Sequence, residues 1–160
     1  MRKLVVLLGV VMAATLIAGC GFTGEAKNKS ESELIQADPE DYKNEVNFIM
    51  EDLKDNLNEQ LSQLEKGDHL AASLIESATA LSWGDAVAIN PPEDYFDLHN
   101  QLDDGLEELT KKATLIKRHY EEGNTEYPEE LVDDLIEKYH EVSEVRYEII
   151  KKYNSDNPVE

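Results

Sequence analysis

The stretch that decides the fold runs from Pro39 to Leu64 and reads PEDYKNEVNFIMEDLKDNLNEQLSQL. A helix tolerates proline at its first position, where no backbone N–H is needed, and Glu40 and Asp41 suit the positive end of the helix dipole. Asp38, directly before the proline, is a typical N-cap residue. This pattern predicts an amphipathic helix, because apolar residues recur every three or four positions. They are Tyr42, Val46, Ile49, Leu53, Leu57, Leu61 and Leu64.

The same start signal occurs twice more, at Pro92-Glu93-Asp94-Tyr95 and at Pro128-Glu129-Glu130-Leu131. Between the first two starts, Lys66-Gly67-Asp68 offers a glycine that can end one helix and an aspartate that can cap the next. We therefore expect a break near Gly67. The alternative is one continuous helix of more than about forty residues.

Apolar positions predict three further helices, and no stretch alternates as a half-buried strand does. The second helix carries Leu70, Leu74, Ala78 and Leu81; the third carries Tyr95, Leu98, Leu102, Leu106, Leu109, Ala113, Ile116 and Tyr120; the fourth carries Leu131, Leu135, Tyr139, Val142, Val145 and Ile149. We predict an all-α protein, an antiparallel four-helix bundle. A three-helix bundle with one long first helix is the alternative.

A different pattern precedes the helices. Met1-Arg2-Lys3 leads into an apolar run from Leu4 to Leu16, which is shorter than the ~20 residues of a transmembrane helix and typical of a signal peptide. The run ends in Ile17-Ala18-Gly19-Cys20, which resembles the lipobox of bacterial lipoproteins. The resemblance implies that a signal peptidase recognises Ile17, Ala18 and Gly19 and cuts before Cys20, and that a diacylglycerol is attached to the Cys20 thiol.

These patterns divide the chain into four parts. We expect a signal peptide over residues 1–19, a lipidated cysteine with a flexible tether over 20–37, a helical bundle over 38–153 and a disordered tail over 154–160. The tether is predicted from its Gly, Lys, Glu, Ser and Asn content and its few apolar residues. Cys20 is the only cysteine, so the chain forms no internal disulfide.

The net charge of the chain excludes some classes of binding partner. The formal net charge is −20, with 35 acidic and 15 basic residues among 160. Such a surface repels polyanions, so we expect no nucleic acid as a partner. Anionic membrane surfaces would not attract it either, which leaves the lipid as the membrane attachment. We expect the protein to be lipid-anchored in the cell membrane, on its extracytoplasmic face.

The sequence contains no catalytic or metal-binding motif, and we predict neither a catalytic residue nor a metal site. Glu137 and His140 form a single Glu-x-x-His pair, but both lie off the apolar stripe of the last helix and are expected to face water. No cofactor is expected apart from the covalent lipid on Cys20. A cleft beside the only tryptophan, Trp83, and nearby tyrosines such as Tyr95 is the candidate site for a small ligand or cation.

Two functions from different classes remain. The first is a non-enzymatic helical interaction module that docks onto an envelope or membrane protein. The second is a lipoprotein that binds a small ligand or cation near Trp83. The body of the chain also resembles small helical lipoproteins of Gram-positive bacteria, a resemblance that transfers no site residues. Exposed apolar residues beyond those that close the bundle would favour the first function, and a closed core with one aromatic pocket the second.

Overall fold

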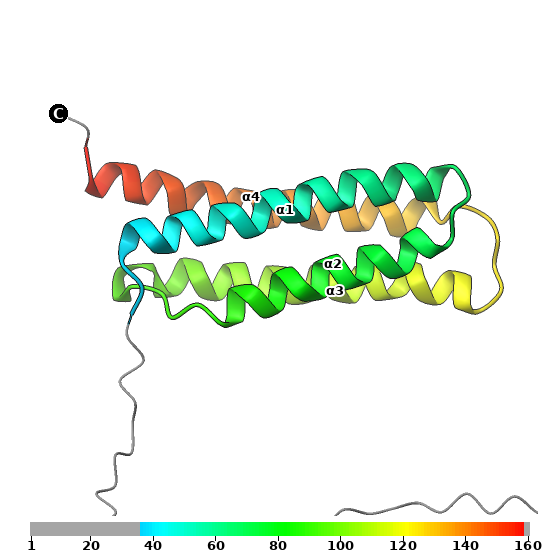
Figure 1. Cartoon of the computed structure of the whole chain (residues 1–160), viewed down its shortest axis with the longest axis horizontal. Coiled ribbons are helices and arrows are strands. Elements are labelled where there is room, and N and C mark those ends of the chain that lie inside the picture. Colours follow the sequence, from blue (N-terminus) through cyan, green and yellow to red (C-terminus); the bar gives the residue numbers. More distant parts are fainter. Residues whose placement is uncertain (1–35, 159–160) are drawn as a thin grey trace, which may run out of the picture. The chain divides into compact units, whose positions relative to one another are not determined.

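The protein is all-helical over the part of the chain that its computed structural model describes, residues 36–158 (Figure 1). No strand occurs within that range. The elements are α1 (Pro39–Glu65), α2 (Leu70–Val87), the 3-10 turn η1 (Glu93–Tyr95), α3 (Phe96–Glu121) and α4 (Glu129–Asp156). The separation of α1 from α2 confirms the predicted break near Gly67.

Each long helix packs against its neighbour in the chain, and α1 also packs against α4 (Figure 1). Two side-chain contacts show which helix ends lie close together. Lys43 of α1 lies over the ring of Tyr153 of α4, and the ring of His69 at the start of α2 stacks on Tyr120 near the end of α3. The largest fully buried side chains of the shared core are Tyr42, Val46, Met50, Leu53, Leu64, Ile75, Leu102, Leu106, Leu109, Ile116, Leu135 and Ile149.

The helix ends follow the expected local chemistry. The Asp38 carboxylate accepts a hydrogen bond from the Glu40 backbone N–H at 2.9 Å, which confirms the predicted N-cap. Gly67 and Gly123 end α1 and α3 with φ of 88° and 89°, a left-handed conformation that glycine adopts without steric cost. At the second proline start, η1 comes first and α3 follows from Phe96.

The predicted core stripe of α2 is wrong. Leu70, Leu74 and Leu81 are 74%, 51% and 68% exposed, and Ala78 is only partly buried. The face of α2 that enters the core instead consists mostly of small side chains, namely Ala71, Ala72, Ile75, Thr79, Ser82 and Ala86. Small side chains let neighbouring backbones approach closely, so α2 packs through them and turns its large leucines outward.

Both borders of the folded body differ from the sequence-based prediction. The Ala37 backbone N–H donates to the Asn90 carbonyl at 2.9 Å, and Ala37 packs against the core, so order begins inside the predicted tether. At the other end, α4 continues through Asp156, where a tail was expected from residue 154. Side chains stabilise this last turn, since Lys152 pairs with Asp156 at 2.9 Å and the Asn157 amide donates to the Tyr153 carbonyl.

Within residues 36–158, no helix is both long enough and apolar enough to span a bilayer.

Candidate interaction surface

The outward side of α2 carries large apolar side chains without a partner in the core. Leu70, Leu74 and Leu81 are separated by four and seven residues, so they lie on one side of the helix. Ala88, seven residues after Leu81, is also exposed. The opposite flank of α2 is occupied, because Glu76 pairs with Lys117 of α3 at 2.8 Å. Leu74 and Leu81 therefore lie on the flank of α2 away from α3, whereas Leu70 borders a hollow that residues of α3 also line.

A groove continues this apolar row toward α1. Phe48 of α1, 73% exposed, and Ile49 line it from one side, and Ala88 and Ile89 line it from the other. Its volume is about 560 Å³. Asn44, Glu45 and Asp85 complete its wall. The groove shows that the exposed flank of α2 faces the same side of the molecule as Phe48.

A row of acids on α1 borders the apolar residues. Glu45 lines the groove, and Asp52 and Glu59 follow at intervals of seven residues, which places all three on one side of the helix. All three are exposed, and none forms an ion pair among the described residues. The other flank of α1 faces α4, where Glu51 pairs with Arg146 and the Asn47 side-chain oxygen accepts from Arg146 Nε at 3.0 Å. We call the surface made by Glu45, Phe48, Asp52, Glu59, Leu70, Leu74, Leu81 and Ala88 the α1/α2 face.

The two predicted ligand residues lie in different surroundings. The Trp83 indole N–H donates to an Asp103 carboxylate oxygen at 2.6 Å, from α2 to α3. Tyr95 is only 2% exposed and packs edge-on against the ring of Tyr42, 5.3 Å between centroids. Each side chain contributes to packing between helices, and the structure does not bring the two together into one aromatic pocket.

Tyr42, which contacts both Tyr95 and His99, is the centre of a polar cluster inside the bundle. The Tyr42 hydroxyl lies 3.3 Å from Nδ1 of His99. Burial raises the pKa of Tyr42 far above its usual range, and the neighbouring Tyr95 adds to the effect. Burial also lowers the pKa of His99, although the charge of Asp103 acts in the opposite direction. Folding therefore favours the neutral form of His99, as expected of a histidine that serves packing.

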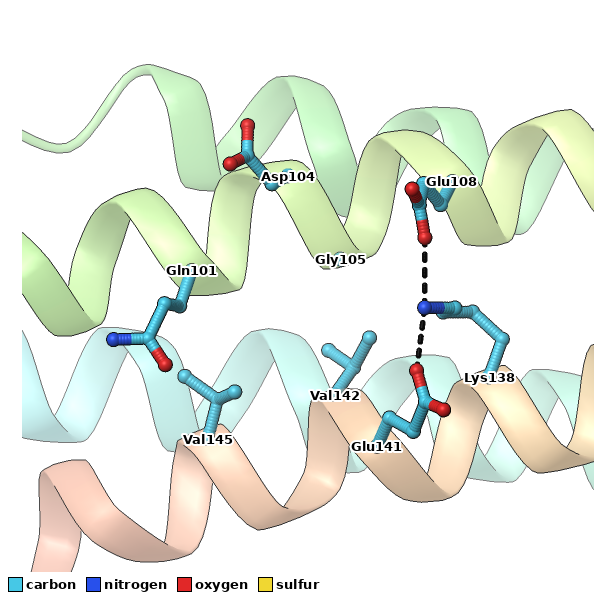
Figure 2. A pocket seen from close by; sticks show the side chains of 8 residues that line it. All are labelled: Gln101, Asp104, Gly105, Glu108, Lys138, Glu141, Val142 and Val145. Atoms are coloured by element: carbon cyan, nitrogen blue, oxygen red, sulfur yellow. Dashed lines mark ion pairs between the residues drawn. The ribbon is translucent and has the colours of Figure 1, made fainter.

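A second hollow lies between α3 and α4, where Gly105 faces Val142 (Figure 2). Its volume is about 270 Å³. Lys138 bridges it by pairing with Glu108 at 2.7 Å and with Glu141 (Figure 2). These ion pairs hold the pKa of Glu108 below and that of Lys138 above its usual value. Three of the charged groups of this hollow, those of Glu108, Lys138 and Glu141, are thus already engaged with one another.

The remaining predicted sites have the following positions. Glu137 and His140 are both exposed on α4, and within residues 36–158 no three His, Cys, Asp or Glu side chains are grouped so that they could hold a metal ion. Cys20 and the recognition residues Ile17, Ala18 and Gly19 lie outside the described residues. Their assignment rests on the sequence.

Sequence reasoning missed the α1/α2 face because it placed Leu70, Leu74 and Leu81 in the core. One signal was present, since Phe48 lies between Val46 and Ile49 but off the stripe that they define. Comparison with known proteins found no matching family model, no matching curated protein and no matching solved structure.

Proposed function

We propose that this chain is a lipid-anchored lipoprotein of the bacterial cell envelope and acts as a non-enzymatic helical interaction module on the extracytoplasmic face of the membrane. Its four helices form an antiparallel bundle, and the α1/α2 face docks a helix of a partner protein. Cys20 carries the lipid, and the chain between Cys20 and α1 links the bundle to the bilayer.

The exposure of the α2 leucines is the observation that carries this proposal. A helix that contributed only to its own bundle would direct its large apolar side chains inward. Contiguous apolar surface that stays exposed and is edged by polar groups is typical of a protein-binding site. The groove beside Phe48 supplies the concave part of such a site, into which a partner side chain can insert.

The antiparallel arrangement is supported by the order of contacts between neighbouring helices. Lys112 of α3 pairs with Asp134 of α4 at 3.2 Å, and Lys138, one turn later in α4, pairs with Glu108, one turn earlier in α3. Residue numbers therefore fall along α3 as those of the paired residues rise along α4. Short connections at Gly67 and Gly123 fit the same topology.

The anchor is supported by the lipobox resemblance at Ile17-Ala18-Gly19-Cys20. It is tested by mass spectrometry of the membrane-extracted protein and of a Cys20→Ala variant. We expect the amino terminus of the native protein to be a lipid-modified Cys20, and we expect the variant to accumulate as unprocessed precursor. Normal cleavage and membrane retention of Cys20→Ala would overturn the anchor.

The interaction role is tested by photocrosslinking in intact producing cells. A photoreactive residue at Leu81 should give one discrete adduct with a membrane or envelope protein, and Leu74→Ser should abolish it. The matched control places the same photoreactive residue at Leu115 of α3, which is also an exposed leucine. Identical adducts from both positions would show that the α1/α2 face is not a specific binding surface.

A further inference from the structure

We propose that the occupant of the α1/α2 face is a cationic amphipathic helix of the partner protein, with apolar residues toward α2 and lysines or arginines toward α1. This inference rests on the proposed docking function and adds the chemistry of the partner.

The apolar row on α2 and the acidic row on α1 have the same spacing. Leu74, Leu81 and the C-cap residue Ala88 recur every seven residues along α2 and its end, as Glu45, Asp52 and Glu59 do along α1. Seven residues of helix rise about 10.5 Å, so each row advances by the same step. Since Glu45 and Ala88 line one groove, the antiparallel arrangement proposed above sets Asp52 beside Leu81 and Glu59 beside Leu74. An apolar row and an acidic row thus run side by side.

The length and shape of the α1/α2 face fit a single partner helix. From Leu70 to Ala88 the apolar row spans 18 residues, or about 27 Å of helix. A helix of similar length can cover it with one apolar stripe, the helix-in-groove mode of recognition. Phe48 and the groove next to it offer a deeper contact at the end where α1 begins.

The charges on α1 and α2 favour a basic partner. Glu45, Asp52 and Glu59 are exposed and form no ion pair among the described residues, although Asp52 accepts a hydrogen bond from the Asn56 amide at 3.2 Å. Asp85 adds a fourth carboxylate at the groove. The segment from Leu70 to Val87 contains no lysine or arginine. A basic flank on the partner would neutralise the acidic row and speed the encounter. A second copy of this chain would instead bring an identical acidic row and a net charge of −20 toward the first.

The proposal is tested with the purified full-length protein and a synthetic 21-residue helix as probe. The probe has leucines on one face and lysines on both flanks, and its binding is followed by fluorescence anisotropy. We expect at least about tenfold weaker binding for Leu74→Ser/Leu81→Ser and for Glu45→Gln/Asp52→Asn/Glu59→Gln. A probe with glutamates in place of the lysines should bind at least about tenfold more weakly to the native protein.

Three glutamates on α4 have the same spacing and charge as the acidic row of α1 and serve as a control. Glu130, Glu137 and Glu144 recur every seven residues on α4 and are exposed. Changing all three to glutamine removes three charges without touching the α1/α2 face, and we expect the lysine probe to bind this variant within about threefold of the native protein. An equal loss from both triple variants would mean non-specific attraction to a polyanion and would overturn the proposal.

The other outcomes separate this inference from the function on which it rests. If the glutamate probe binds as well as the lysine probe and Leu74→Ser/Leu81→Ser weakens both, the docking function stands and the cationic partner is wrong. Self-association that this leucine variant abolishes would assign the face to a second copy and overturn the inference. Leucine-dependent binding to phosphatidylcholine–phosphatidylglycerol vesicles without probe binding would assign the face to lipid and overturn both.

Discussion

Single residues decide how closely the helices of this bundle approach. A Cβ atom at Gly105 would lie 2.8 Å from Cγ2 of Val142, so α3 and α4 are in contact through a position where no side chain fits. A Cβ atom at Gly84 would meet no atom within 4 Å. Replacing each of these two helical glycines with alanine should therefore change the stability in opposite directions.

Gly105→Ala is expected to lower the free energy of unfolding by about 1 kcal/mol, because the overlap with Val142 outweighs the better helix propensity of alanine. Gly84→Ala, the matched control, is expected to raise it by about 0.5–1 kcal/mol. Urea denaturation measures both. The double variant Gly105→Ala/Val142→Ala should be more stable than the sum of its single changes; simple additivity would contradict the contact.

His99 gives the fold a dependence on pH. Because burial lowers its pKa in the folded state, the unfolded chain takes up the proton more readily. Its contribution is complete above the unfolded pKa of about 6.5 and is lost as the pH falls toward the folded pKa, by at most about 1.4 kcal/mol per pH unit. The groups around it are Tyr42 and Asp103.

The measurement is the free energy of unfolding from pH 7.5 to 5 for the native protein and for His99→Gln. The native protein should lose more stability over this interval than the variant, whatever their difference at pH 7.5. Parallel curves would show that His99 takes up its proton equally in the folded and unfolded states.

At the scale of the element, the Asp38 cap fixes where α1 begins. Asp38→Ala is expected to cost about 1 kcal/mol, because the Glu40 backbone N–H loses its acceptor. Asp41→Ala removes the same charge from the same turn but keeps the cap bond. Thermal unfolding should show a larger loss of stability for Asp38→Ala than for Asp41→Ala, and equal losses would assign the effect to charge alone.

The helices differ in how far their sequences predicted them. α1 could be predicted because most of its large apolar residues lie on its core face, from Tyr42 to Leu64, with Phe48 as the exception. In α2, three leucines lie off the core face. The expectation that leucines face the core therefore placed Leu70, Leu74 and Leu81 on the wrong side of the helix. The packing that turns them outward depends on alanines, a serine and a threonine meeting α1 and α3, and their pattern along the chain carries too little hydrophobic contrast to show it. The start of α1 and the break at Gly67 are set by local chemistry, and the sequence predicted both.

The surroundings of Trp83 and Tyr95, the two candidate ligand residues, could not be predicted from the sequence for a related reason. Their partners, Asp103 and Tyr42, come from other helices, and no local pattern indicates those contacts.

At the scale of the whole molecule, the charge of −20 opposes the compact state. Most ion pairs of the described region have at least one exposed partner and contribute little each, so screening should relieve more repulsion than attraction. Raising NaCl from about 50 mM to about 500 mM is expected to stabilise the protein by about 1 kcal/mol, or ~4 °C in Tm. Glu130→Gln/Glu137→Gln/Glu144→Gln should show a smaller increase. A Tm that falls with salt would mean that ion pairs dominate.

The proposed function requires that the exposed leucines of α2 serve docking while the buried leucines of α3 serve folding. The most direct measurement compares the free energies of unfolding of Leu81→Ala and Leu106→Ala by urea denaturation. Leu81 is 68% exposed and Leu106 is fully buried. We predict a change within about 0.5 kcal/mol for Leu81→Ala and a loss of about 2–5 kcal/mol for Leu106→Ala. A loss of several kcal/mol from Leu81→Ala would place this residue in the core and would contradict the α1/α2 face as a free surface.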